Sequence, residues 1–159
     1  MKEETESLVK ELIEQTSTAY LATIDKNGLP YIRAVFNLRC PKSFPHSTKI
    51  IEEYETDPYT TYISTNTSSI KMKHIRINNN VAIYYCKPGD IKGIMLQGKA
   101  EIMEDMEFKK NIWEDNWTIY YPKGYTDPDF TMLKIKPEYI KGWFRGHHIH
   151  RIENQLGLH

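Results

Sequence analysis

The hydrophobic and polar positions along the chain change their periodicity several times, and most of these changes indicate short strands. Residues 18–25 alternate apolar and polar side chains, and a second strand-like run covers residues 30–38. The tetrapeptide Asp25-Lys26-Asn27-Gly28 lies between them and is typical of a hairpin turn, because glycine tolerates the positive φ that such turns need. The pattern predicts five further strands, at residues 59–64, 81–86, 91–103, 130–136 and 139–145.

Helical spacing is found in fewer places. Leu8, Val9, Leu12 and Ile13 recur at the spacing of one helix face, with Glu and Lys on the other face. Residues 5–16 are therefore predicted to form an amphipathic helix. Further helices are predicted at residues 68–77 and 105–119, with a short one at 48–55, and irregular segments at 39–46, 78–80 and 121–129.

Seven short strands joined by tight turns, with few helices, indicate a mainly β protein of the α+β class. A closed or nearly closed antiparallel barrel accommodates such strands, because closure removes exposed strand edges. We expect the helices to cap and flank this barrel.

Composition and charge limit the function classes. The 159 residues suggest one domain, and 21 basic residues balance 21 acidic ones. A zero net charge argues against broad nucleic-acid binding, which needs a basic surface. The chain contains no apolar run long enough for a transmembrane helix, and its acidic start is unlike a secretory signal. Cys40 and Cys86 show no metal or redox spacing, so we interpret them as reduced thiols of a cytoplasmic protein.

The segment Thr65-Asn66-Thr67-Ser68-Ser69-Ile70-Lys71 carries the clearest chemistry. It follows a strand-like run and precedes a helix-like one, with Ser68 as the expected helix cap. Free amides and the positive end of the helix dipole favour an anion at such a junction. The hydroxyl groups and Lys71 add donors and a full charge. The segment therefore indicates a ligand that carries a phosphate.

Four stretches follow one another in a recognisable order: residues 22–35, 65–71 with 80–84, 95–101, and 121–143. In this order they resemble the pyridoxamine 5′-phosphate oxidase-like superfamily of FMN-binding split barrels. The last stretch, which contains Tyr-Pro-Lys-Gly and Asp-Pro-Asp-Phe, is closest to the general stress protein branch. The resemblance implies an antiparallel split β-barrel with flanking helices over residues 1–146, followed by a C-terminal tail at residues 147–159.

The resemblance also implies a homodimer with FMN at the subunit interface and a small-molecule substrate. Arg33, Ser69 and Lys71 match the residues that hold the FMN phosphate, and Thr65 matches a residue beside the flavin. A planar guanidinium and a compact ammonium are suited to phosphate oxygens. The full set of cofactor-binding residues expected from the resemblance is Arg33, Ala34, Val35, Ser64, Thr65, Ser69, Ile70, Lys71 and Trp117.

The sequence departs from the oxidase itself at several positions. Ile70 stands where the oxidase has a basic residue, and Leu38 stands where it has a lysine. Gly93 occupies the position of a glutamine near the flavin, whereas Gln97 lies elsewhere on the strand. The substrate-binding segment has only a loose counterpart at residues 145–147. These differences argue against vitamin B6 as the substrate.

No acid–base pair, nucleophilic triad or metal-ligand spacing is apparent, which suits a protein whose cofactor carries the chemistry. We therefore predict an FMN-dependent oxidoreductase that passes hydride or electrons to a small organic acceptor. The sequence leaves open a haem-binding split barrel that uses His147 and His148, a non-catalytic flavin-binding stress protein, and a nitroimidazole reductase. It also leaves open a deazaflavin in place of FMN.

Two groups of residues have a structural and a functional interpretation. Phe108, Trp113 and Trp117 have helical spacing and are expected in the core, although Trp117 or Trp143 could instead line the flavin edge or the dimer interface. His147, His148 and His150 are expected in a solvated tail, with metal, substrate or haem contact as the alternatives.

Overall fold

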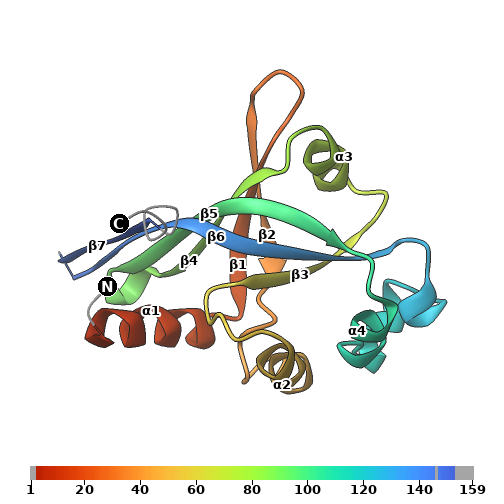
Figure 1. Cartoon of the computed structure of the whole chain (residues 1–159), viewed down its shortest axis with the longest axis horizontal. Helices are drawn as coiled ribbons and strands as arrows, with labels where there is room; N and C mark the ends of the chain where they lie inside the picture. Colours follow the sequence, from red (N-terminus) through yellow and green to blue (C-terminus); the bar gives the residue numbers. More distant parts are fainter. Residues whose placement is uncertain (1–2, 146, 153–159) are drawn as a thin grey trace, which may run out of the picture.

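In the computed structural model, residues 3–145 and 147–152 form one strongly curved antiparallel sheet with helices around it (Figure 1). The strand order is β2-β1-β4-β5-β6-β3, and β7 pairs with β6. This arrangement confirms the mainly β, antiparallel split barrel with flanking helices. The strands are β1 (Thr18–Ile24), β2 (Pro30–Phe36), β3 (Thr61–Asn66), β4 (Asn80–Lys87), β5 (Lys92–Met103), β6 (Phe130–Phe144) and β7 (His147–Ile152).

The split of the barrel lies between β2 and β3, which are the two ends of the strand order. Their Cα atoms approach within 8 Å, yet no ladder joins them among the residues that the structure describes. The edges of the two strands therefore face each other across a gap, and the sheet is not continuous there. A gap between facing edges is a place where a ligand can be held from two sides.

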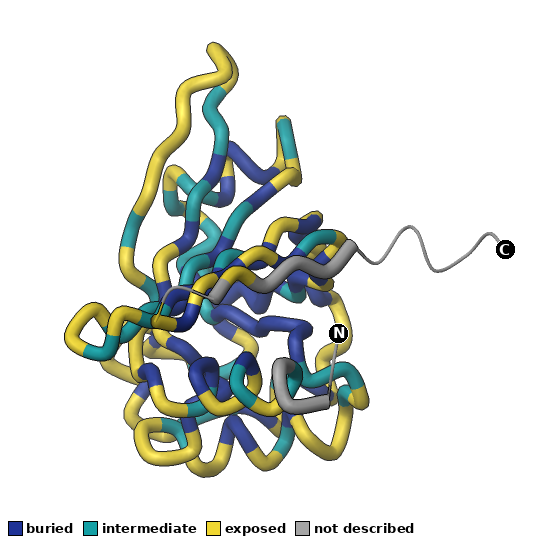
Figure 2. The backbone as a smooth tube through the Cα atoms, turned by 90° about the vertical axis from the view of Figure 1, so that its left-hand side faces the viewer, coloured by how far each residue is buried: buried dark blue, intermediate teal, exposed yellow. Residues whose placement is uncertain are grey.

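The hairpin of β1 and β2 projects away from the rest of the molecule, and its tip is exposed (Figures 1 and 2). Its turn has the predicted form. Asp25 Oδ1 accepts hydrogen bonds from the amides of Asn27 (2.8 Å) and Leu29 (2.9 Å), and Gly28 has a φ of 81°. An Asx turn closed by a glycine with positive φ sets the register of β1 against β2. This register decides which β2 side chains face the split.

The helices are α1 (Glu3–Gln15), α2 (Pro45–Tyr54), α3 (Ile70–Ile77) and α4 (Met106–Asn111), with 3₁₀ turns η1 (Pro88–Asp90), η2 (Asp115–Ile119) and η3 (Gly124–Thr126). The apolar face of α1 enters one buried cluster with Leu21 and Ile63 of the sheet. A second, more aromatic cluster joins α2, α4 and η2 around Tyr62, Phe108 and Phe130. The second cluster supports the side of the barrel on which the split opens.

The two strands predicted at residues 130–136 and 139–145 are one strand, β6. Pro137 suggested a break, because proline cannot donate a ladder hydrogen bond. The register of β5 and β6 shifts here, since Gly98 lies opposite Pro137 whereas Gln97 lies opposite Tyr139. Glu138 is thus an extra residue in a β-bulge, which is where a strand tolerates proline.

The single helix predicted at residues 105–119 is also wrong, because α4 ends at Asn111 and η2 begins at Asp115. Glu114 lies between them in an extended conformation and accepts hydrogen bonds from the amide (3.1 Å) and hydroxyl (2.7 Å) of Ser47. Trp113 packs edge-to-face against Trp117 and Phe130. These tertiary contacts outweigh the local helical pattern.

Residues 147–152, which the sequence assigned to a tail, form β7 and pair with residues 139–144 of β6. His147, His148 and His150 lie on this strand, and the side chain of His148 is exposed. Residues 153–159 lie outside the described residues. Within the part of the chain that the structure describes, no three His, Cys, Asp or Glu side chains could together hold a metal ion.

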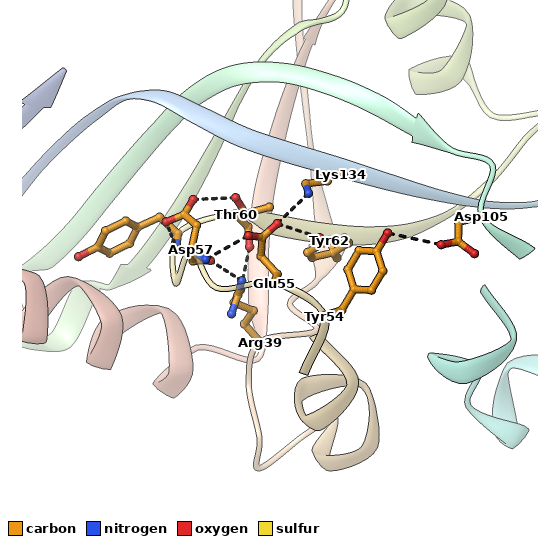
Figure 3. A network of polar contacts seen from close by, with 9 residues as sticks. Arg39, Tyr54, Glu55, Asp57, Thr60, Tyr62, Asp105 and Lys134 are labelled. Atoms are coloured by element: carbon orange, nitrogen blue, oxygen red, sulfur yellow. Dashed lines mark hydrogen bonds and ion pairs between the residues drawn. The ribbon is translucent and has the colours of Figure 1, made fainter. Parts of the chain in front are cut away.

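A polar network ties the end of α2 to β3 and β6 (Figure 3). Lys134 forms an ion pair with Glu55 (Nζ–Oε2, 2.7 Å), and the Tyr62 hydroxyl donates to the same carboxylate (3.2 Å). The buried Arg39 donates to the carbonyl groups of Asp57 (2.8 Å) and Thr60 (2.7 Å). Burial tends to raise the pKa of Glu55, but its hydrogen bonds and the charge of Lys134 hold that pKa below its ordinary value.

Because the folded state lowers the pKa of Glu55, the ionised carboxylate stabilises the fold above its ordinary pKa. This contribution is lost as the pH falls through the lower, folded-state value. We expect Glu55→Gln to lower the free energy of unfolding by about 1–3 kcal/mol at pH 7, and the deficit to shrink in acid. Urea unfolding between pH 3 and pH 7 measures this difference.

The control for Glu55 is Glu14→Gln. Glu14 pairs with Lys10 at 3.6 Å on the exposed face of α1, where such pairs contribute about 0.3–0.5 kcal/mol. A deficit in Glu55→Gln that does not depend on pH would contradict the role assigned to the ion pair.

Candidate functional site

An open cleft of about 270 Å³ lies at the split between β2 and β3. One side is formed by the last three residues of β2, and the other by the last three residues of β3. The first turn of α3 and the segment around η2 complete it. The lining residues are Thr18, Ala34, Val35, Phe36, Ser64, Thr65, Asn66, Lys71, Trp117, Tyr120 and Tyr121.

The turn from β3 into α3 presents hydrogen-bond donors to one end of this cleft. Ser69 is the N-cap residue of α3, but its hydroxyl makes no capping bond and instead lies 3.4 Å from the Thr65 hydroxyl. The first helical bond starts at the amide of Met72, so the amides of Ile70 and Lys71 precede the hydrogen-bonded turns. The positive end of the helix and the paired hydroxyl groups of Ser69 and Thr65 therefore lie together.

Asp129, in the loop before β6, holds this turn in place. Its carboxylate accepts from the Ser68 amide (2.8 Å) and the Asn66 side-chain amide (2.7 Å), and its carbonyl accepts from the Thr67 amide (2.8 Å). The hydrogen bonds to its carboxylate hold the pKa of Asp129 below its usual range, and the bond from Asn66 has the largest effect. The expectation that Ser68 caps the helix is wrong, because Asp129 binds the Ser68 amide and α3 begins two residues later than predicted.

Two cations are associated with the cleft: Lys71 lines it, and Arg33 is close enough for its charge to act on Lys71. Burial lowers the pKa of Lys71, and the charge of Arg33 lowers it further, so the two side chains are electrostatic neighbours. Burial also lowers the pKa of Arg33. The ion pairs found within residues 3–145 and 147–152 do not include either side chain. Two half-buried positive charges without a carboxylate partner would be stabilised by an anion between them.

The structure brings most of the predicted site residues together. Six of them line the cleft itself: Ala34, Val35, Ser64, Thr65, Lys71 and Trp117. Arg33 and Ser69 are linked to residues of the lining. The charge of Arg33 acts on Lys71, and the hydroxyl of Ser69 contacts that of Thr65. The side chain of Ile70 is 59% exposed and is not part of the lining. Trp117 is only 2% exposed, so most of its surface packs in the second core cluster.

Sequence reasoning missed several residues of the lining, namely Thr18, Phe36, Asn66, Tyr120 and Tyr121. Tyr120 directly follows the helix predicted at residues 105–119, and Tyr121 begins the predicted irregular segment at residues 121–129, where no periodic pattern distinguishes a ligand contact. Phe36 follows Ala34 at the spacing of one strand face, and this alternation was the available signal.

The chemistry of the cleft fits a flavin mononucleotide. One end offers Arg33, Lys71, a helix terminus and hydroxyl groups, which are the donors that phosphate requires. The remainder is lined by aromatic and neutral polar side chains, which suit a planar ring with polar edges. The site therefore has a charged end and an aromatic end, as flavin mononucleotide does.

The sequence profile described as pyridoxamine 5′-phosphate oxidase matches residues 5–144. This match covers most of the chain and includes every residue that lines the cleft. The chain belongs to the pyridoxamine 5′-phosphate oxidase family. The predicted resemblance is thereby confirmed. A comparison with curated proteins finds no match.

Solved structures of this oxidase family's fold extend over nearly the whole chain. A Clostridium acetobutylicum protein related to general stress protein 26 of Bacillus subtilis is 26% identical, with a TM-score of 0.76 over 98% of this chain and 99% of that chain. General stress protein 26 from Bacillus anthracis is 22% identical, with a TM-score of 0.65 over 90% and 98%. A heme-binding protein from Mycobacterium smegmatis is 13% identical, with a TM-score of 0.64 over 91% and 57%. The last two similarities concern the fold alone.

Two further sequence expectations concern the thiols and the membrane. Cys40 and Cys86 are both free, and Cys40 is buried. None of the helices described in the structure has the length and apolar character needed to cross a membrane.

Proposed function

We propose that this chain is an FMN-binding oxidoreductase that passes hydride or electrons to a small organic acceptor. The observation that carries the proposal is a pair of cations, Lys71 in the lining of an aromatic cleft and its electrostatic neighbour Arg33, and neither forms an ion pair with a carboxylate among the described residues. Membership of the pyridoxamine 5′-phosphate oxidase family supports the same cofactor.

Each residue has a distinct role in this proposal. Arg33 and Lys71 bind the phosphate, and Ser69 donates to it from the start of α3. Thr65 and Ser64 lie on β3 and line the cleft, and in this proposal they bond the polar edge of the ring. The bound FMN supplies the hydride or electron transfer, while the protein orients it and limits its access to water.

The first test is the visible absorption spectrum of the purified protein, before and after FMN is added and the excess removed. A retained flavin spectrum would support the cofactor assignment. A haem band instead of a flavin band would overturn it in favour of the haem-binding alternative, and His147→Ala and His148→Ala would then locate the axial ligand.

The oxidoreductase part needs a separate test, because a flavin-binding stress protein would retain FMN without turnover. We expect reduced bound FMN to be reoxidised faster when a small organic acceptor, such as a quinone or a nitroaromatic compound, is present. Stopped-flow absorbance of the flavin follows this reaction in the absence of oxygen. Reoxidation at one unchanged rate with every acceptor would favour the non-catalytic alternative.

We also propose that a second copy of the chain covers the outer face of β2. Ile32, Ala34 and Phe36 lie on this face, and their exposure is high: 71% for Ile32 and 44% for Phe36. Ala34 and Phe36 also line the cleft, so a chain packed on this face would close the cofactor site. Exposed apolar side chains that border a ligand site are typical of an interface.

We expect the wild-type protein to be a dimer in solution and Ile32→Glu to shift it toward monomer, because a buried carboxylate would oppose association. Light scattering after gel filtration measures the mass, and FMN affinity should fall as dimerisation is lost. The control is Ile77→Glu, which makes the same change at a 66% exposed residue of α3. A wild-type monomer that binds FMN fully would contradict the interface.

A further inference from the structure

We propose that Thr23 and His74 form a buried relay that positions the guanidinium of Arg33 at the phosphate end of the cleft. The inference rests on the proposed FMN function and assigns positioning roles to two residues that do not line the cleft. Its basis is a chain of short polar contacts, Arg33–Thr23–His74, that crosses from β2 through β1 to α3.

The contacts anchor one end of the Arg33 guanidinium. Nη1 of Arg33 donates to the Thr23 hydroxyl at 2.7 Å, and it also lies 3.2 Å from the carbonyl groups of Leu21 and Tyr31. No hydrogen bond within the described residues uses Nε or Nη2 of Arg33. The donors that remain on Nε and Nη2 form one edge of the planar group, which is the arrangement that binds two oxygens of an anion.

The relay has a consistent direction. An arginine N–H can only donate, so the Thr23 oxygen accepts from Arg33 and its single proton is available for His74. The Nδ1 atom of His74 lies 3.0 Å from that oxygen, and in the proposed relay it accepts the hydrogen bond from the Thr23 hydroxyl. An imidazole that accepts at Nδ1 is neutral, because a protonated ring has no acceptor. With this direction, the relay adds no third positive charge beside Arg33 and Lys71.

Burial makes this relay rigid. Thr23 is 0% exposed and His74 is 8% exposed, so neither group can exchange its partner for bulk water without cost. The ring of Tyr31 packs edge-on against the His74 ring, with centroids 4.7 Å apart, and covers it from the hairpin side. A rotation of the Arg33 side chain would therefore leave the Thr23 hydroxyl without its cationic donor.

The position of His74 also links the two cations. His74 follows Lys71 by three residues on α3, so both side chains project from neighbouring turns of one helix. Thr23 and Arg33 lie on the hairpin, and the relay joins this hairpin to α3. The relay therefore sets the distance between Arg33 and Lys71, which the repulsion between their like charges would otherwise increase.

The test compares FMN with riboflavin, which has the same ring but no phosphate. In Thr23→Val, which removes the hydroxyl and keeps the shape, we expect FMN affinity to fall about tenfold, the scale of one charge-assisted hydrogen bond. Riboflavin affinity should change little, because Arg33 acts on the phosphate. Thr23→Ser, which restores a hydroxyl, should recover most of the FMN affinity.

The matched control is Thr61→Val. Thr61 is also a buried strand residue, and its hydroxyl lies 2.9 Å from the Tyr85 hydroxyl, away from Arg33. This variant loses a buried hydrogen bond, so its thermal stability should fall as that of Thr23→Val does, but its ratio of FMN to riboflavin affinity should stay at the wild-type value. If Thr23→Val does not fold, His74→Leu, which removes the acceptor at the far end, replaces it in the same comparison.

The outcomes separate the inference from the proposed function. A wild-type protein that binds no FMN would overturn both. FMN binding that is equal in the wild-type protein and Thr23→Val would overturn the relay and leave the cofactor assignment intact. Equal losses of FMN and riboflavin affinity would also overturn it, because they would show a general structural effect instead of positioning at the phosphate.

Discussion

Lys71→Ala is expected to weaken FMN binding by about 1–3 kcal/mol, the scale of a lost hydrogen bond to a charged group. The Lys71 ammonium is half-buried beside Arg33, and this repulsion is relieved when a phosphate lies between the two charges. The loss corresponds to a dissociation constant roughly five to 150 times higher. Fluorescence quenching of FMN during titration with the protein measures it directly.

Arg33→Ala should cause a loss of similar size, and the double variant should reduce the affinity for FMN toward that for riboflavin. Lys73→Ala and Arg76→Ala are the controls, because they remove the same charges from exposed positions of α3. Both controls should keep wild-type affinity apart from a small, salt-sensitive change. Unchanged FMN affinity in Lys71→Ala and Arg33→Ala would contradict the cofactor site.

Trp117→Ala is expected to lower the free energy of unfolding by about 3–5 kcal/mol, the usual cost of truncating a large buried aromatic residue. The Trp117 side chain is 2% exposed and packs against Trp113 (ring centroids 5.8 Å apart) and Phe130 (5.9 Å). The cleft should also lose its wall beside Tyr121, so FMN affinity should fall with stability. Urea unfolding followed by circular dichroism gives the first quantity.

Trp117→Phe separates the two roles of this residue, since it keeps an aromatic ring in the core. We expect it to recover more than half of the stability lost in Trp117→Ala. Trp143→Ala serves as the control, because Trp143 is 42% exposed and its truncation leaves a smaller cavity. Stability that is unchanged in Trp117→Ala, together with lost FMN affinity, would identify Trp117 as a ligand contact and not as part of the core.

The sequence predicted those features of this fold that depend on neighbouring residues. The hairpin turn at Asp25–Gly28 forms as expected, because an Asx turn and a glycine with positive φ need no distant partner. The alternation in β1, β4 and β5 also predicted strands correctly, since it records which face is buried. The cluster of hydroxyls and Lys71 suggested a candidate anion site for the same local reason.

Distant contacts decided the features that the sequence pattern did not indicate. The helix expected at residues 105–119 is interrupted because Glu114 bonds with Ser47, which lies 67 residues earlier. Pro137 remains within β6 because Gly98, on another strand, allows a bulge opposite it. No local pattern encodes either partner.

For the candidate site, too, some features followed from the sequence and others only from the tertiary structure. The sequence by itself determined the antiparallel barrel, the family resemblance and the identity of Arg33, Ser69 and Lys71 as candidate phosphate ligands. Only the tertiary structure placed β2 beside β3 to form the cleft and turned Tyr120 and Tyr121 toward it. It also joined Arg33 to His74 through Thr23, which lies 51 residues before His74 in the chain. Residue types and local periodicity determine most of the elements, whereas the interruptions within them and the contacts between them depend on how the whole sheet folds.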